Sequence, residues 1–254
     1  MIKIKTPEDI ILLRESGRRL ALVLAELEKV VAPGIKTSEL DDLARDLIKK
    51  TGDQPAFLNY RPHGSVLAFP AALCVSVNDE IVHGVPGPKV LQTGDIVGLD
   101  LGLNHRGRFT DMAATVPVGK ISSEAQKMIT AAREALNQGV EACRPGQTIG
   151  DIGWAIEKTV KRFGFSVIND LTGHGVGLAV HEDPLIPNFG RPGMGATLKP
   201  GMVLALEPMI TLGTGDIKLG RDGFTFKTKN GNISTHFEHT VLITDNEPEI
   251  LTKL

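Results

Sequence analysis

The chain has 254 residues, of which 41% are hydrophobic and 23% charged, and its formal net charge is −2 at pH 7. This balance is ordinary for a globular protein with a substantial core, and it gives no reason to expect bulk binding to nucleic acid or to a membrane. The first residues lack the long apolar stretch of a signal peptide, and the apolar run at 20–27 is too short to span a bilayer, so we expect a cytoplasmic protein.

Two helices are expected at the start of the chain. Apolar residues recur at helical spacing through residues 8–31, and Thr6 followed by Pro7 forms a typical N-terminal cap. After a break at Pro33-Gly34, a second helix is expected over residues 38–50. Ser38 is its predicted cap, with Asp41 in the third position of a capping box.

The same order of elements recurs about 110 residues further along, too long a period for a solenoid repeat. In the first copy, the two helices are followed by strands expected over residues 73–77, 96–101 and 113–118. The second copy has helices over 123–143 and 149–163, separated by Pro145-Gly146. Residues 91–100 align with residues 198–207, and in both copies a turn leads into an apolar strand that ends on a carboxylate.

Two long copies indicate a pseudo-twofold α+β arrangement in which both half-sheets line one central cleft. No stretch has the composition of a linker. We therefore expect a single domain over residues 1–254, with repeat halves at 1–118 and 119–254.

Asp100 and Asp111 are expected to lie on one face of a hairpin whose turn falls in residues 104–107. Their separation of 11 residues, with a loop of even length, places both side chains on the same side of the two strands. Two carboxylates there would repel unless a cation lay between them. A solvated pair is the alternative, but the apolar lead-in at 96–99 is typical of a strand buried on both faces.

Two glutamates occupy comparable places in the second half of the chain. Glu207 closes the apolar strand 202–206, and Glu238 lies in an alternating strand expected over residues 236–244. A single glutamate in such a place is more often at the surface. Two of them, matched by two aspartates in the other repeat, favour metal ligation.

Three histidines are candidates for the same cleft. His174 lies between two glycines, which permit close approach of another group, although the spacing does not match a phosphate-binding loop. His181 follows seven residues later, and His83 is expected at a strand end. The remaining histidines are expected to be ordinary core or loop residues: His63, His105, His236 and His239.

The candidate ligands are therefore four carboxylates and one imidazole: Asp100, Asp111, His174, Glu207 and Glu238. This set carries too much negative charge to be buried without cations, and it has too few thiolates or imidazoles for a structural zinc site. Oxygen-rich ligation with a single histidine indicates two divalent ions bridged by shared carboxylates. A site of that kind is typical of hydrolases.

With these residues the chain resembles the type I methionine aminopeptidases of the pita-bread fold over essentially its whole length. The resemblance rests on segments in family-like order and spacing: Val77-Asn-Asp-Glu-Ile-Val-His-Gly-Val-Pro86, Gly94-Asp-Ile-Val97, Gly173-His-Gly-Val-Gly177, Leu198-Lys-Pro-Gly-Met202 and Phe237-Glu-His-Thr240. It implies an antiparallel sheet lining a central cleft for two metal ions, with the helices outside.

The resemblance also implies an activity, the hydrolytic removal of the initiator methionine from nascent chains whose second residue is small. A hydroxide held by two divalent ions would attack the peptide carbonyl; cobalt, manganese, iron and zinc all suit these ligands. Asp100 would chelate one ion, His174 and Glu207 would bind the other, and Asp111 and Glu238 would bridge them. We expect a monomer, and docking on the ribosome is left open.

Further roles are implied for residues around the ions. His83 and His181 would contact the substrate and the developing tetrahedral intermediate, and Glu207 is a candidate proton shuttle. Phe69, Cys74 and Phe224 would contribute to an apolar pocket for the methionine side chain. Phe224 stands where some bacterial relatives carry Trp and Phe69 where some carry Tyr, so the resemblance does not fix the pocket shape.

Two alternatives remain open on the same fold. Proline-specific peptidases carry a separate N-terminal domain, a histidine four residues before the metal-binding histidine and an arginine near the last ligand. Here Asp170 stands in the first place and His236-Phe237-Glu238 in the second. A non-catalytic binding protein would lose ligands, whereas this chain has all five.

Overall fold

Within the residues that the structure describes, two pairs of helices alternate with groups of strands. The structure is a computed structural model that describes residues 1–61 and 67–254, so His63 lies outside the described residues. The helices are α1 (Pro7–Val30), α2 (Thr37–Thr51), α3 (Ser123–Glu141) and α4 (Ile149–Arg162). The strands are β1 (Gln54–Pro55), β2 (Cys74–Val77), β3 (Glu80–Val82), β4 (Ile96–His105), β5 (Arg108–Pro117), β6 (Ser166–Val167), β7 (Thr172–Gly175), β8 (Glu182–Pro187), β9 (Val203–Leu206), β10 (Met209–Thr211), β11 (Ile217–Leu219), β12 (Phe226–Thr228), β13 (Ser234–His236), β14 (His239–Leu242) and β15 (Glu249–Ile250).

The N-terminus of α1 is capped as the sequence predicts. The Thr6 hydroxyl accepts a hydrogen bond from the Asp9 backbone, and the Asp9 carboxylate accepts one from the Thr6 backbone. Because Pro7 has no N–H, it costs nothing at the first helical position. The reciprocal pair satisfies two of the N–H groups that every helix start leaves unpaired.

The predicted cap of α2 is wrong. The helix begins one residue before Ser38, with Lys36 as N-cap, and the Glu39 carboxylate accepts a hydrogen bond of 2.7 Å from the Lys36 backbone. Asp41 is buried, and its carboxylate accepts hydrogen bonds from the backbone N–H groups of Ala72 and Leu73. The carboxylate that the sequence pattern assigned to the helix cap therefore makes a tertiary contact instead.

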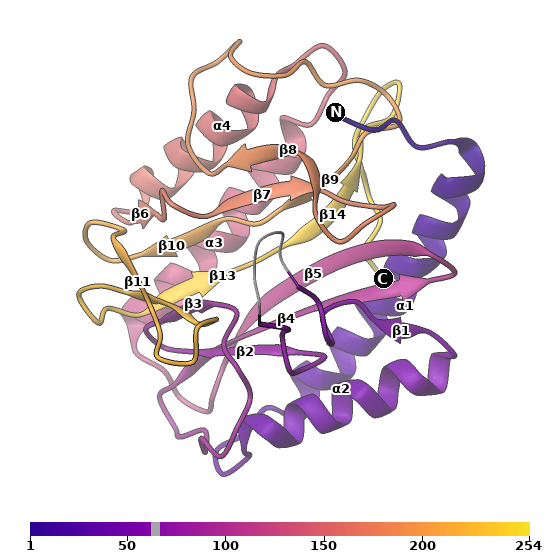
Figure 1. Ribbon diagram of the computed structural model, residues 1–254. Coiled ribbons are helices and arrows are strands. Elements are labelled where there is room, and N and C mark those ends of the chain that lie inside the picture. Colours follow the sequence, from indigo (N-terminus) through magenta and orange to yellow (C-terminus); the bar gives the residue numbers. More distant parts are fainter. Residues whose placement is uncertain (62–66) are drawn as a thin grey trace.

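The strands form four antiparallel sheets within the described residues (Figure 1). Along one edge β4 pairs with the whole of β5, and along the other it pairs with β2 and β1. The β4–β5 hairpin reverses at Arg106 and Gly107, whose φ angles of 52° and 79° suit a tight two-residue turn. A five-stranded sheet has the order β15-β14-β9-β7-β8, and two three-stranded sheets have the orders β13-β10-β6 and β11-β12-β3.

The internal repeat is visible in the backbone hydrogen bonds. The N–H of Gly34 donates to the carbonyl of Leu91, and the N–H of Gly146 donates to the carbonyl of Leu198. Gly34 and Gly146 have φ angles of 96° and 87°, which an L side chain adopts only with strain. In both halves the loop between the helices is therefore fastened to the turn that precedes the long apolar strand.

The strand expected over residues 236–244 is interrupted. β13 ends at His236 and β14 begins at His239, and the two belong to different sheets. Glu238, between them, exchanges backbone hydrogen bonds with Ala113 of β5. The apolar alternation continues through the break because both strands are buried, so the sequence pattern could not reveal that the partner strand changes.

The helices pack against the strands that carry the candidate ligands. α1 packs on β4 and β5, α3 packs on β9, β10 and β13, and each pair of helices packs together. In Figure 1, α2 lies at the lower margin and α4 at the upper left, with strands between them. No helix in residues 1–61 or 67–254 has the length and apolar character needed to cross a membrane.

Candidate metal centre

A pocket where the sheets meet collects every site residue predicted from the sequence. Its lining consists of Phe57, Tyr60, Phe69, Cys74, His83, Asp100, Asp111, His174, His181, Glu207, Phe224 and Glu238. Phe57 and Tyr60 were not predicted. Both belong to a loop, and no periodic pattern shows where a loop residue points.

The two aspartates lie on one face of the β4–β5 hairpin. Asp100 is directly opposite Ala113, and Asp111 is directly opposite Gly102, which places the two carboxylates diagonally on the same side of the pair. Both side chains are buried. The hairpin geometry predicted from their spacing is therefore confirmed.

Threonine hydroxyls hold β5 against the segment that carries Glu238. The Thr240 hydroxyl donates to the Asp111 carbonyl at 2.8 Å and accepts from the Asp111 N–H at 2.9 Å. The Thr115 hydroxyl makes the same two contacts with the backbone of His236. These side chains replace ladder hydrogen bonds where the strand is interrupted, and they fix the backbone on both sides of Glu238.

His174 enters the pocket from β7 with its ring orientation fixed. Its Nδ1 donates to the carbonyl of Gly175 at 3.0 Å, which leaves the Nε2 lone pair free. A Cβ on Gly173 would lie 2.4 Å from the carbonyl oxygen of Ala205, and one on Gly175 would lie 2.2 Å from that of Asp183. The flanking glycines are therefore needed for close backbone packing.

His236 was predicted to be an ordinary core or loop residue, but it lies beside the candidate ligands. Its Nε2 is 3.4 Å from an oxygen of Glu207 and 3.8 Å from an oxygen of Glu238. His174 Nε2 is similarly placed, 3.5 Å from Glu207 and 3.9 Å from Asp111. The signal available in the sequence was the position of His236 two residues before Glu238, on a strand that leads into the cleft.

Burial shapes the electrostatics of the centre. It raises the pKa of all four carboxyl groups, and mutual repulsion adds to the shift for Asp100, Asp111 and Glu238. Burial also lowers the pKa of His174 to about 3. The protein alone therefore favours neutral carboxylic acids and a neutral imidazole here, and bound cations would reverse that preference for the carboxylates.

The donor set fits divalent ions. Three buried atoms of the centre have no hydrogen-bond partner among residues 1–61 and 67–254: Asp100 Oδ1, Glu238 Oε1 and His236 Nε2. This is costly unless another group satisfies them. In the part of the chain that the structure describes, two groups of ligand atoms within 4.8 Å of one another share Glu238: one with Asp111 and His174, the other with Glu207 and His236. Asp100 belongs to neither group but lines the same pocket.

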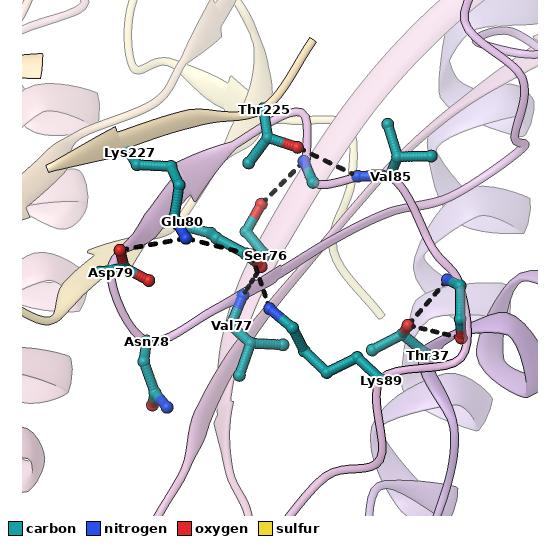
Figure 2. Close-up of polar contacts among 12 residues, drawn as sticks. Thr37, Ser76, Val77, Asn78, Asp79, Glu80, Val85, Lys89, Thr225 and Lys227 are labelled. Atoms are coloured by element: carbon teal, nitrogen blue, oxygen red, sulfur yellow. Dashed lines mark hydrogen bonds and ion pairs between the residues drawn. The ribbon is translucent and has the colours of Figure 1, made fainter. Parts of the chain in front are cut away.

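His83 stands at the pocket because the backbone turns sharply after β3. It has a φ of 57°, unusual for a residue with a side chain. The neighbouring N–H groups of Gly84 and Val85 donate to the hydroxyls of Ser76 and Thr225, and Figure 2 shows the contact between Val85 and Thr225. The Thr225 hydroxyl also lies 3.3 Å from the His83 carbonyl. These contacts hold the strained turn in place.

The β2–β3 turn before His83 is held by a carboxylate. Glu80 accepts a hydrogen bond of 2.8 Å from the N–H of Val77, and it pairs with Lys89 at 2.6 Å and Lys227 at 3.7 Å. Figure 2 shows Glu80 between the two ammonium groups. The side of the pocket that carries His83 is thus connected to β12 through Lys227.

His181 lies on the opposite side, at the start of β8. Its Nδ1 is 2.6 Å from the Tyr60 hydroxyl, and its ring is 4.4 Å from the ring of His174. Burial lowers the pKa of His181, so the ring is neutral at neutral pH. Tyr60 therefore connects His181 to the loop that contributes Phe57 to the apolar wall of the pocket, which consists of Phe57, Phe69, Cys74 and Phe224.

The apolar wall contains the residues predicted for it. The rings of Phe69 and Phe224 meet edge to face at 5.5 Å, and Cys74, a free thiol, lies opposite Asp100 in the β2–β4 pairing. Phe57 packs in the same cluster. A long apolar side chain of a bound peptide can pack against this wall while the peptide backbone remains near the carboxylates.

Comparison with known proteins agrees with this geometry. The sequence profile of metallopeptidase family M24 matches residues 11–245. The chain belongs to metallopeptidase family M24. Its membership implies use of a divalent metal, consistent with the buried carboxylates and imidazoles. The resemblance to methionine aminopeptidases inferred from the sequence is confirmed by the relatives described next.

Within the M24 family the chain is similar to methionine aminopeptidases. It is 44% identical over 254 residues to methionine aminopeptidase 1 of Bacillus subtilis, and the match covers 100% of both chains. The crystal structure of methionine aminopeptidase from Thermotoga maritima superposes with a TM-score of 0.95 at 42% identity and full coverage of both chains.

The pita-bread fold of this M24 chain is also found in prolidases. The prolidase of Pyrococcus horikoshii matches with a TM-score of 0.79 at 23% identity, and the match covers 98% of this chain but 63% of the prolidase. At that identity the similarity shows the fold alone. The predicted fold class is confirmed by both sets of structures.

Proposed function

We propose that this chain removes the N-terminal methionine from proteins whose second residue is small, with two divalent ions bound in the pocket described above. One observation carries the proposal. Buried carboxylates and imidazoles lie directly beside an apolar wall of Phe57, Phe69, Cys74 and Phe224. A hydrolytic centre beside a pocket for one long apolar side chain suits the release of a terminal methionine.

The carboxylates and His174 would hold the ions, with Asp111 and Glu238 placed to be shared between them. Bound divalent ions lower the pKa of a water and polarise the scissile carbonyl. Glu207 lies at the centre with its backbone carbonyl held by the Asn188 side chain at 3.0 Å. It can accept a proton from the attacking water and deliver it to the departing amine.

The two histidines outside the ion site would act on the substrate. If the Tyr60 hydroxyl donates to Nδ1 of His181, the ring carries its proton on Nε2 and can donate it to the carbonyl oxygen. His83 faces the pocket from the other side, with its pKa lowered to about 4 by burial, so it too is neutral. Both can bind the substrate peptide group without adding charge beside the cations.

The substrates would be nascent chains in the cytoplasm, and we propose that the single domain acts as a monomer. The choice of ion among cobalt, manganese, iron and zinc depends on supply as well as on ligand type.

The deciding experiment is methionine release from a Met-Ala-Ser peptide by metal-free protein, titrated with manganese, cobalt, iron and zinc salts. A Leu-Ala-Ser peptide and an Ala-Pro peptide serve as matched substrates. Metal-dependent release of methionine alone supports the proposal. Faster cleavage of the Ala-Pro peptide would assign a proline-specific activity, and failure to bind any divalent ion would assign a non-catalytic protein.

A further inference from the structure

We propose that His236 is a sixth protein ligand of the metal centre, placed to share an ion with Glu207 and Glu238. This inference rests on the proposed function, because it concerns the same pair of ions. It adds a nitrogen ligand to the five residues that the sequence pattern identifies.

Within the described residues, His236 Nε2 has no hydrogen-bond partner. The residue is 2% exposed, and this nitrogen is buried with no hydrogen bond in the described part of the chain. A buried ring nitrogen without a partner costs free energy, so its orientation toward two carboxylates requires an explanation.

The distances suit a shared ion better than a hydrogen bond. Nε2 lies 3.4 Å from Glu207 Oε2 and 3.8 Å from Glu238 Oε2, beyond the range of a good N–H···O bond, about 2.7 to 3.2 Å. Ligand atoms about 2.0 to 2.2 Å from one ion, with an angle of about 90° to 110° between them, are about 2.8 to 3.6 Å apart. The contact with Glu207 falls in that range, and the contact with Glu238 lies just above it.

His174 provides an internal comparison. Its Nε2 lies 3.5 Å from an oxygen of Glu207 and 3.9 Å from an oxygen of Asp111. These distances are almost the same as the two distances from His236 Nε2 to its carboxylate neighbours. The two oxygens of Glu207 face different imidazoles, Oε1 toward His174 and Oε2 toward His236. The two imidazoles therefore lie at similar distances from carboxylate oxygens, His174 at the wall of the pocket and His236 buried behind it.

The backbone of His236 is fixed independently of any ion. The Thr115 hydroxyl accepts from its N–H at 2.9 Å and donates to its carbonyl at 2.8 Å. The ring can therefore ligate without rearrangement of the strand. A neutral imidazole also leaves the balance between four carboxylates and two divalent ions unchanged.

A second imidazole would shift the metal preference. Imidazole suits zinc, iron and nickel, whereas manganese favours carboxylate and water. Loss of His236 should therefore weaken zinc binding more than manganese binding. We expect the same for cobalt, which lies between iron and nickel in the general order of metal affinity. We expect a loss of at least about 10-fold for cobalt, because even outer-shell partners of metal ligands contribute about 10- to 100-fold.

The test uses the full chain loaded with cobalt(II), with proton NMR to count the paramagnetically shifted N–H resonances of ligating imidazoles. Wild-type protein should show two such resonances and His236→Gln one. Glutamine retains an N–H donor for Glu207, so it separates ligation from a hydrogen-bonding role. His239→Gln is the matched control, because His239 lies on the same segment but its Nδ1 contacts Thr252 at 2.9 Å.

The outcomes distinguish this inference from the proposed function. Two resonances in wild-type protein and in His239→Gln, with one in His236→Gln, support ligation by His236. A single resonance in cobalt-loaded wild-type protein overturns the inference and leaves the proposed function in place. No cobalt bound by folded wild-type protein overturns both.

Discussion

Asp111 and Glu238 are the carboxylates with the most demanding predicted role, because each would contact both ions. Asp111→Asn and Glu238→Gln preserve size but remove the negative charge. We expect each to lower methionine release by at least about 100-fold, the upper end of what outer-shell changes alone produce. Bound metal, measured by elemental analysis after gel filtration, should fall in the same variants.

Asp42→Asn is the control for these substitutions. Its carboxylate lies on the exposed face of α2, so activity and metal content should match the wild type. Wild-type turnover in either pocket variant would remove the proposed dinuclear site.

His83 is expected to act on the substrate without holding an ion. It lines the pocket but belongs to neither group of clustered ligand atoms. His83→Ala should therefore lower kcat by about 100-fold or more, the scale typical of a positioned acid–base or hydrogen-bonding group. Metal content measured in parallel should be unchanged, and loss of metal would identify His83 as a ligand.

At the residue scale the sequence pointed to the carboxylates because each lies within or beside an apolar strand, where an unpaired charge is costly. Asp100 and Glu207 are examples, and both line the pocket. The expectation that Asp100 ends its strand is wrong, because β4 continues to His105. The sequence did not predict that His236 lies beside the carboxylates or that Tyr60 lines the pocket. A histidine in a buried strand is usually a core residue, and the direction of a loop tyrosine depends on the tertiary path of the loop.

At the scale of elements, the loop before β12 positions the turn that carries His83. Thr225 joins them, because its hydroxyl lies 2.6 Å from Asp222 Oδ2 and 3.3 Å from the His83 carbonyl. Thr225→Val keeps the shape but removes these two contacts and the hydrogen bond that the hydroxyl accepts from the Val85 N–H. We expect kcat to fall by about 10- to 100-fold with metal retained, since a displacement of about 1 Å at a catalytic group costs about 100-fold.

Thr225→Ser is the matched variant, because it restores the hydroxyl and should recover most of the activity. Steady-state kinetics on Met-Ala-Ser with both variants separates the hydroxyl from the methyl group. If Thr225→Val retains the wild-type kcat, the turn holds His83 without this contact.

The segment before α1 is fastened to the loop that carries His181. Lys5 and Glu182 form an ion pair of 2.8 Å whose side chains are 1% and 4% exposed. Lys5→Met leaves the carboxylate buried without its cation, so it should lower the free energy of unfolding by about 3 to 5 kcal/mol. Urea unfolding monitored by circular dichroism measures this, with exposed Lys3→Met as the control.

The double variant Lys5→Met with Glu182→Gln tests the cause. Removing both charges should recover part of the lost stability, whereas equal destabilisation in the single and double variants would mean that the methylene packing of Lys5 matters more than its charge.

At the element scale the helices were predicted almost to the residue, because apolar periodicity and caps such as Thr6 are local signals. The wrong predictions share a cause. Asp41 does not cap α2, because its carboxylate accepts hydrogen bonds from the backbone N–H groups of Ala72 and Leu73. The strand expected through Glu238 is divided between two sheets. Both depend on contacts between residues far apart in the sequence, which periodicity does not encode.

At the scale of the whole molecule, the centre links folding to pH. Burial, with repulsion from Glu207 in the case of Asp111, raises the pKa of Asp111 and Glu207 to about 8. In an unfolded chain these groups titrate near pH 4, about their ordinary pKa values. Between those values the folded metal-free protein binds more protons than the unfolded chain, so its stability falls as the pH rises.

The buried histidines act in the opposite direction at lower pH. Burial lowers the pKa of His83 to about 4 and that of His174 and His236 to about 3, against about 6.5 for an unfolded chain. The unfolded chain binds more protons in that interval, so stability rises with pH up to about 6.5. Above it, the carboxylate effect remains.

We therefore expect metal-free protein to melt at a lower temperature at pH 8 than at pH 6.5. Each carboxyl group contributes up to about 1.4 kcal/mol per pH unit, and each kcal/mol corresponds to about 2 to 4 °C for a chain of this size. Cations hold the carboxylates ionised, so saturating manganese should raise the melting temperature more at pH 8 than at pH 6.5. Differential scanning calorimetry of metal-free wild-type protein and Asp111→Asn measures the slope, which should be smaller in the variant because it lacks one titrating group. A melting temperature of the metal-free wild type that rises between pH 6.5 and pH 8 would mean that these carboxylates are already ionised without metal, and that cations are not needed to stabilise them.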